Sequence, residues 1–208
     1  MAKHFKPITR DPKRCRAQIT QLGALLQTKP ALSEKNDIQP FFKARPQLAA
    51  FVCSYMRDIG PATDHAFEYP FFGDFAADLV VGDREAGRFC LIEFEDGRRD
   101  SIFKKPKGRA TTEWSRRFEH GFSQIVDWFS ALDDFKKTER FRADFGAGHV
   151  RFSALLVIGR ATGVSERDRQ RLEWRTEKVR VDSHTVECVT FDALHEHMDR
   201  HLRLNTGY

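Results

Sequence analysis

Two carboxylates, Glu93 and Glu95, lie two residues apart in the segment RFCLIEFE, residues 88–95. The apolar and aromatic composition of this segment predicts a strand, and side chains along a strand alternate between its two faces. We therefore expect Glu93 and Glu95 on one face, with Ile92 and Phe94 on the other. Carboxylates this close repel each other, so either solvent exposure or a divalent cation must compensate their charge.

A third carboxylate, Asp78, begins the segment DLVV, residues 78–81, which predicts the partner strand of a hairpin. A loop over residues 82–87 places Asp78 opposite residue 91 and diagonal to Glu93, within about 7–8 Å. Hard oxygen ligands at this separation suit Mg²⁺ or Mn²⁺, which bind one or two carboxylates and keep several waters. Many exposed hairpins share this spacing, but here the strands are strongly apolar and a basic loop follows them.

Positive charge follows the predicted hairpin directly. The loop over residues 96–112 contains the phosphate-binding candidates Lys104, Lys105, Lys107 and Arg109. The next segment, residues 113–135, has the apolar periodicity of a helix. One polar stripe on this helix repeats every three or four residues and contains Glu113, Arg117, His120, Gln124 and Asp127. Arg117 and Gln124 could position a phosphate, although a solvated helix face would show the same pattern.

The elements expected around these residues form a mixed α/β domain with a central sheet. Residues 1–17 are basic and poorly periodic and are interpreted as an arm. Helices are expected over residues 16–28, after a cap at Ser33 or Asp37, after Pro46, and over 165–177 and 191–202. Asp37 is the preferred cap because Pro40 would then lie in the first turn. Further strands are expected over 149–160, as a central strand, and over 185–191.

Composition and charge limit the class of protein. The chain has 208 residues with 40% hydrophobic and 31% charged residues, which is typical of a globular domain. The net charge is +5, yet residues 64–100 hold ten acidic and four basic side chains. No apolar stretch approaches the ~20 residues of a membrane helix. The four cysteines are isolated, which argues against a zinc site of the CxxC type and predicts a reducing, cytoplasmic setting.

Several of these segments together resemble the C-terminal nuclease domain of the Shedu anti-phage defence family, within the PD-(D/E)xK phosphodiesterases. The resemblance rests on the order of the segments SEKNDIQPFFKARPQL, DLVVGD, LIEFE, FSQIVDW, ALLVIGR and VTFDAL. It implies a restriction-endonuclease-like α/β fold, a central mixed β-sheet flanked by helices. It also implies a Mg²⁺- or Mn²⁺-dependent endonuclease acting on phage or plasmid DNA, in defence against phage, and a homo-oligomer.

Transferred residue by residue, the resemblance makes Asp78 and Glu93 the metal-binding acids. The position usually held by lysine is Glu95. The usual lysine orients or deprotonates the attacking water and offsets charge on the phosphate. Glu95 could instead be a further metal ligand or a general base, Lys104 or Lys105 could reach back into the site, or the enzyme could be inactive.

The remaining matches are Gln124, on the helix after the hairpin, and Glu34, which corresponds to a glutamate on the first core helix. Glu34 and His120 are accessory candidates, while Lys104, Lys105, Arg109 and Arg117 would neutralise the DNA backbone. We expect an N-terminal arm and short helix over residues 1–30 and a nuclease-like domain over 31–208. The alternatives are a catalytically decayed module that binds or senses nucleic acid, and a basic subunit that pairs with acidic proteins.

Overall fold

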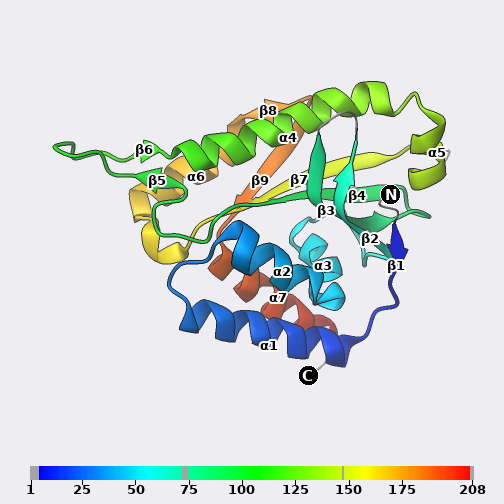
Figure 1. The fold of residues 1–208 in the computed structure, drawn as a ribbon, viewed down its shortest axis with the longest axis horizontal. Helices are drawn as coiled ribbons and strands as arrows, with labels where there is room; N and C mark the ends of the chain where they lie inside the picture. Colours follow the sequence, from blue (N-terminus) through cyan, green and yellow to red (C-terminus); the bar gives the residue numbers. More distant parts are fainter. Residues whose placement is uncertain (1–4, 72–74, 147, 207–208) are drawn as a thin grey trace.

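A seven-stranded sheet runs through the middle of the molecule, between two layers of helices (Figure 1). The computed structural model describes residues 5–71, 75–146 and 148–206. The strand order is β1-β2-β3-β4-β7-β9-β8. This confirms the predicted fold class, an α/β domain whose central mixed sheet is flanked by helices.

The sheet combines antiparallel and parallel pairs. Its strands are β1 (Lys6–Pro7), β2 (Asp64–Pro70), β3 (Ala76–Asp83), β4 (Arg88–Phe94), β7 (Arg151–Val157), β8 (Arg180–Val181) and β9 (His184–Val189). Neighbours from β1 to β4 are antiparallel, β4, β7 and β9 are parallel, and β8 is antiparallel to β9. Parallel neighbours require long crossovers, and these contain the helices α4 to α6. A separate two-stranded hairpin joins β5 (Phe103–Lys104) to β6 (Glu113–Trp114).

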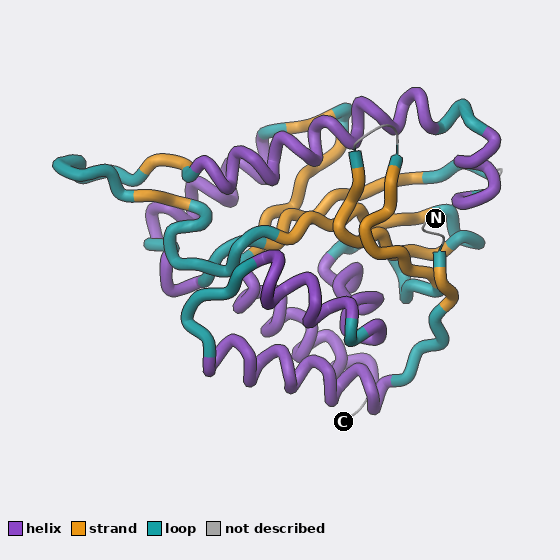
Figure 2. Tube along the Cα trace, in the orientation of Figure 1, coloured by secondary structure: helices purple, strands orange, loops and turns teal. Residues whose placement is uncertain are grey.

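Helices cover both faces of the sheet, as the tube in Figure 2 also shows. The helices are α1 (Pro12–Thr28), α2 (Gln39–Lys43), α3 (Pro46–Phe51), α4 (Arg116–Phe135), α5 (Glu139–Phe145), α6 (Glu166–Lys178) and α7 (Phe191–Thr206). Short turns of other helix types are η1 (Glu34–Ile38), η2 (Val52–Tyr55) and η3 (Ala161–Gly163). Helices α1, α2, α3 and α7 lie on one face and α4 on the other (Figure 1). Among the described residues, every helix is too short or too polar to cross a membrane.

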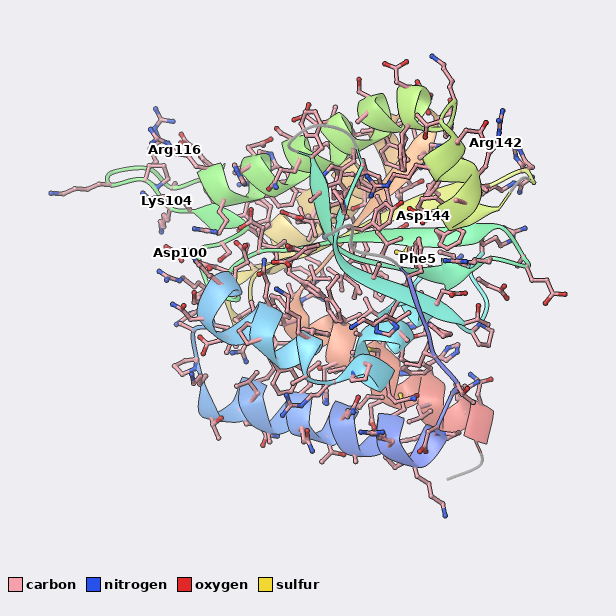
Figure 3. All side chains as sticks on the ribbon, turned by 45° about the vertical axis from the view of Figure 1, so that its right-hand side comes forward. Phe5, Asp100, Lys104, Arg116, Arg142 and Asp144 are labelled. Atoms are coloured by element: carbon pink, nitrogen blue, oxygen red, sulfur yellow. The ribbon has the colours of Figure 1, made fainter. Side chains whose placement is uncertain are left out.

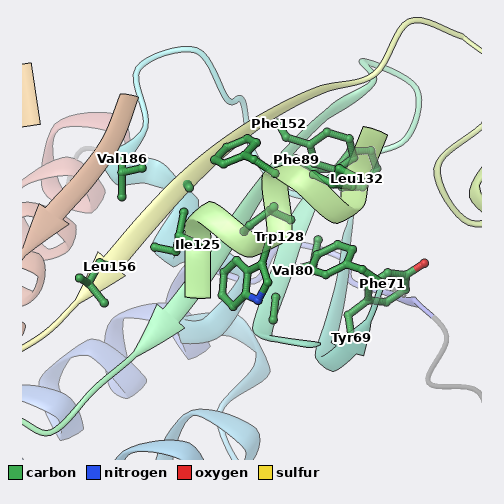
Figure 4. Close-up of a cluster of buried hydrophobic side chains, with 14 of the residues drawn as sticks. Tyr69, Phe71, Val80, Phe89, Ile125, Trp128, Leu132, Phe152, Leu156 and Val186 are labelled. Carbon is green, nitrogen blue, oxygen red and sulfur yellow. The ribbon is translucent and has the colours of Figure 1, made fainter. Parts of the chain in front are cut away.

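An aromatic core joins α4 to the sheet. Ile125, Trp128 and Leu132 of α4 are buried against side chains of β3, β4, β7 and β9 (Figure 4). Their spacing of three and four residues places all three on the lower face of the helix. Full burial of this many large side chains is the main source of the free energy that fixes α4 over the sheet. This matters for the site because α4 also carries Arg117, His120 and Gln124.

The hairpin of β3 and β4 has a different register from the predicted one. Leu79 pairs with Ile92, and the turn contains only residues 84–87 because β3 continues to Asp83. The Asp83 side chain accepts hydrogen bonds from the backbone N–H groups of Glu85 and Ala86, which closes the tight turn. The predicted loop over residues 82–87 was therefore two residues too long. Continued along the strands, the observed register sets Asp78 directly across from Glu93 and not diagonal to it.

The N-terminal region is more ordered than the predicted arm. Lys6–Pro7 pair with β2, and α1 begins at Pro12, four residues before the expected start. The side chain of Asp11 caps this helix by accepting a hydrogen bond from Arg14 N. The interpretation of residues 1–17 as an arm is thus wrong for 5–17, and residues 1–4 lie outside the described part. The helices expected at residues 165–177 and 191–202 are confirmed, with Ser165 as the cap of α6.

Candidate active site

The acidic residues predicted to do chemistry meet where β3 begins and β4 ends, beneath α4. Ile92 and Phe94 belong to the core on the side of α1 and α7, so the alternate residues Glu93 and Glu95 face α4. This confirms the predicted separation of the two faces. Across the hairpin, Asp78 shares the face of Glu93, because directly opposed residues of an antiparallel pair point the same way.

Asp78 is held by two hydrogen bonds, one to each carboxylate oxygen. Gln39 Nε2 donates to Oδ1 at 2.8 Å, and the backbone N–H of Phe94 donates to Oδ2 at 2.9 Å. Burial raises the pKa of Asp78 to about 6; the charge of Glu95 adds to this increase, and the Phe94 hydrogen bond opposes it. Within the described residues, the ionised form of Asp78 therefore has no ion pair to neutralise it.

Glu93 is the most strongly perturbed acid of the group. It is 4% exposed, and burial raises its pKa well above the usual value. The charges of Asp78, Glu95 and Glu34 raise this pKa further, while a hydrogen bond from Gln124 lowers it. The Gln124 Oε1 atom is buried and has no hydrogen-bond partner within the described residues. A buried acceptor without a donor beside a buried carboxylate marks a place suited to a water molecule or a cation.

Glu95 is buried, and both of its carboxylate oxygens contact α4. Arg117 donates to Oε2 at 2.7 Å, and His120 Nδ1 lies 3.1 Å from Oε1. The Glu95 side chain is 1% exposed, whereas that of Arg117 is 43% exposed and that of His120 69%. The two basic side chains therefore connect a buried carboxylate with solvent.

The π-helical turn η1 adds Glu34 to the group. Ser33 accepts a hydrogen bond from Asn36 N and caps this turn, so the expected preference for Asp37 as the cap was wrong. Glu34 lies 3.3 Å from Gln39 Nε2 and 3.4 Å from Arg117 Nη1. Burial raises the pKa of Glu34 to about 7, with further contributions from Glu95 and Asp78. A π-turn often occurs at functional sites, where it redirects a side chain.

Two members of the site were missed by the sequence analysis. Asp96 accepts a hydrogen bond from Glu34 N at 2.9 Å and lies 3.4 Å from Arg117 Nε. Gln39 bridges Glu34 and Asp78. Asp96 could have been predicted from the sequence, because it directly follows the acidic residues Glu93 and Glu95. No sequence pattern around Gln39 indicates a functional role, because its contact with Asp78 depends on how the π-turn η1 packs against the hairpin.

Gly121 lets α4 approach the carboxylates closely. A Cβ atom at this position would lie 2.8 Å from Leu156 Cδ1 and 3.0 Å from Glu95 Cγ. Any larger residue would have to displace either the buried leucine or Glu95. The missing side chain thus sets the distance between the basic residues of α4 and the acids of β4.

The predicted phosphate-binding residues divide into two groups. Arg117 lies at the acids, with Gln124 and His120 of the same helix. Lys104, Lys105 and Arg109 lie on the exposed hairpin of β5 and β6, where Arg109 pairs with Glu113. Within the described residues, the cation that contacts Glu95 is therefore Arg117 and not Lys104 or Lys105.

The donor atoms at this site fit a divalent cation that keeps most of its waters. Asp78 and Glu93 are opposed carboxylates, and the charge of Asp78 raises the pKa of Glu93. Within the described residues, the buried Gln124 Oε1 atom has no hydrogen-bond partner. Glu95 is already bonded through both oxygens. No three acidic, histidine or cysteine side chains in the described part of the chain are arranged to hold a metal together. The fit is thus to two carboxylates and water, a ligand set that Mg²⁺ accepts.

The chain matches a known protein family over most of its length. A family model described as "Shedu protein SduA, C-terminal" matches residues 31–195. A comparison with curated proteins found no match. The matched residues include β3, β4 and α4, and with them every acidic, basic and amide side chain described above.

Proposed function

Because the chain belongs to the Shedu SduA C-terminal family, we propose that it is a divalent-metal-dependent DNA endonuclease that acts in defence against phage. In this proposal the core is of the PD-(D/E)xK type, and the substrate is phage or plasmid DNA. The protein would act as a homo-oligomer in the cytoplasm. The four cysteines are unpaired, which supports a reducing compartment.

One observation carries the proposal: Asp78 and Glu93 share one face of a buried hairpin and have raised pKa values, and no ion pair to either acid occurs among the described residues. Buried like charges are costly unless a positive charge compensates them. A structural role would be served better by apolar side chains at the same positions. Retained acids with perturbed pKa values in one cluster favour a functional site.

The roles of the residues follow from their contacts. Asp78 and Glu93 would hold a hydrated Mg²⁺ or Mn²⁺, which when bound lowers the pKa of water and offsets charge on the scissile phosphate. Glu95 would accept the proton of the attacking water. His120 Nδ1, 3.1 Å from Glu95 Oε1, would pass that proton to solvent, since its ring is largely exposed. Gln124 would orient the water through its free Oε1 atom.

Arg117 would supply the positive charge that lysine provides elsewhere in such sites. Its guanidinium contacts Glu95, Glu34 and Asp96 and is still partly exposed. From this position it would neutralise charge that develops on the phosphate. The departure at Glu95 is thus compensated by a cation from α4.

The experiment is a plasmid-cleavage assay with Mg²⁺ or Mn²⁺. The intact protein should cut supercoiled DNA, and Glu93→Gln should lower the rate of cleavage by at least ~10²-fold. Glu85→Gln, in the exposed hairpin turn, is the matched control and should cut normally. Equal cutting by the intact protein and Glu93→Gln would remove Glu93 from the mechanism.

A second candidate is a module that binds nucleic acid but has lost catalysis. The observation that favours it is the engagement of both Glu95 oxygens by Arg117 and His120, together with glutamate at the lysine position. This reading predicts salt-dependent DNA binding without cleavage under Mg²⁺, Mn²⁺ or other divalent ions. If no divalent ion either supports cleavage or raises the melting temperature, the second candidate replaces the first.

A further inference from the structure

A basic β-hairpin, residues 103–114, projects from the body of the molecule between β4 and α4 (Figures 1 and 2). We call it the basic wing. It has a single acidic residue, Glu113, and four exposed basic residues: Lys104, Lys105, Lys107 and Arg109. Arg109 pairs with Glu113, whereas no ion pair to Lys104, Lys105 or Lys107 occurs among the described residues. Three cations of the wing are thus available to an external anion.

The tip of the wing is a tight turn in solvent. Arg109 N donates to Pro106 O at 3.3 Å, and Gly108 has a φ of +78°. This combination is typical of a type II turn, whose third residue needs positive φ. A Cβ atom on Gly108 would meet nothing within 4 Å. The turn therefore presents Lys107 at the outer end of an arm that is roughly 10–13 Å long from Lys104, at ~3.3 Å per residue.

The base of the wing is fixed by α6. The guanidinium of Arg171 lies 4.8 Å from the ring of Phe103 and 5.3 Å from that of Trp114. The same guanidinium donates to Thr112 O at 3.1 Å and pairs with Asp168 at 2.9 Å. A cation held between two rings and a carboxylate keeps one geometry. The direction of the wing is therefore set before any partner binds, which reduces the entropy lost on binding.

The root of the wing adjoins the acidic site. Only seven residues separate Glu95 from Phe103, and Ser115 N, at the start of α4, donates to Ile102 O at 2.9 Å. Lys104 and the exposed Arg116 lie at the same end of the molecule, with Asp100 below them (Figure 3). The cluster of carboxylates repels phosphate, so a DNA strand needs cations beside it to be held there.

We propose that the basic wing lies along the phosphate backbone of duplex DNA and holds it next to the acidic site. This inference rests on the proposed function, because it assigns the surface that grips the substrate of that site. Single strands are usually bound by bases stacking on exposed rings. The wing offers no such ring, since Phe103 is 4% exposed and Arg171 and Arg175 both lie over Trp114. Its chemistry is that of a backbone contact without sequence preference.

The test is duplex binding over a series of salt concentrations, in EDTA to prevent cleavage. The double variant Lys105→Gln/Lys107→Gln removes two exposed cations of the wing. The control Lys13→Gln/Arg14→Gln removes two exposed cations of α1, on the far side of the sheet (Figure 1). The wing variant should bind at least ~10-fold more weakly at 0.1 M salt, and its log–log salt slope should fall by about 1.8, for two lost phosphate contacts. The control should match the intact protein.

The outcomes separate this inference from the proposed function. If the intact protein binds duplex DNA and the wing variant keeps both affinity and slope, the wing inference fails while the proposed function stands. If both double variants lose affinity equally, the wing has no special role and the inference also fails. Binding of the intact protein to RNA in preference to duplex DNA would overturn the choice of partner. If the intact protein binds no nucleic acid in EDTA, the wing inference fails, and the plasmid-cleavage assay with Mg²⁺ or Mn²⁺ decides the proposed function separately.

Discussion

At the scale of single residues, the site is a group of buried acids that are easier to protonate than the same residues in an unfolded chain. The pKa values are raised for Glu93, to about 6 for Asp78, and to about 7 for Glu34, chiefly by burial. The folded protein thus keeps protons that the unfolded chain has already released. The resulting stabilisation is complete below about pH 4 and is lost as the pH rises through the folded-state values.

Replacement of Glu93 should therefore stabilise the protein at neutral pH. We expect Glu93→Gln to raise the melting temperature by roughly 2–6 °C at pH 7.5, because glutamine needs neither a buried charge nor proton uptake on folding. The gain should shrink at pH 5, because less of the Glu93 carboxyl is then ionised in the unfolded chain, and folding forces less proton uptake. Thermal unfolding at both values measures this. A lower melting temperature at pH 7.5, or the same gain at both pH values, would contradict the burial of Glu93 among other acids.

Replacement of Arg117 should change the rate of DNA cleavage more than the affinity for DNA. We expect Arg117→Gln to lower kcat for plasmid cleavage by roughly 10²-fold, because the phosphate then loses its nearest cation. Arg117→Lys should recover much of this loss, since a lysine restores the positive charge. Arg116→Gln, one residue away and exposed, is the control for cleavage. A loss confined to KM, or an equal loss in kcat for Arg116→Gln, contradicts the role proposed for Arg117.

At the scale of secondary-structure elements, the site depends on how closely α4 approaches the end of β4. Gly121→Ala should destabilise the protein by about 1–3 kcal/mol through overpacking against Leu156 and Glu95, despite the higher helix propensity of alanine. Ser123→Ala, on the exposed side of α4, also raises helix propensity, by a smaller amount and without the clash. Urea denaturation of both variants tests this. The contact is less tight than described if Gly121→Ala is as stable as Ser123→Ala.

Elements that are determined by the pattern of neighbouring residues could be predicted from the sequence, whereas elements that depend on pairing with a distant segment could not. The apolar stripe of α4 and the helix over residues 165–177 depend on neighbouring residues, and both are confirmed. The hairpin register failed because Gly82 suggested a turn, although β3 continues past it and Gly82 pairs with Phe89. The strand β1 was missed because two residues have no period, and only pairing with β2 makes them a strand.

At the scale of the whole molecule, the fold class could be predicted but the assembly of the site could not. Alternating strands and helices indicate an α/β sheet, whereas the strand order depends on contacts between distant segments. Gln39, which directly follows the π-turn η1, donates hydrogen bonds to both Asp78 and Glu34, and no periodicity of the sequence indicates this bridge. The cation at Glu95 comes from α4, and its identity depends on the rotation of that helix over the sheet, which short-range patterns do not specify.

The proposed nuclease activity depends on Asp78 and Glu93 sharing one divalent cation. A calorimetric titration of Mn²⁺ into the DNA-free protein at pH 7.5 measures this most directly, with Asp78→Asn, Glu93→Gln and the control Glu85→Gln beside it. We predict one bound ion for the intact protein and for Glu85→Gln, with protons released on binding because the ion favours the ionised forms of carboxyls whose pKa values are raised. Asp78→Asn and Glu93→Gln should each lose the binding heat. Equal Mn²⁺ binding by all four proteins, or none by the intact protein, would contradict the assignment.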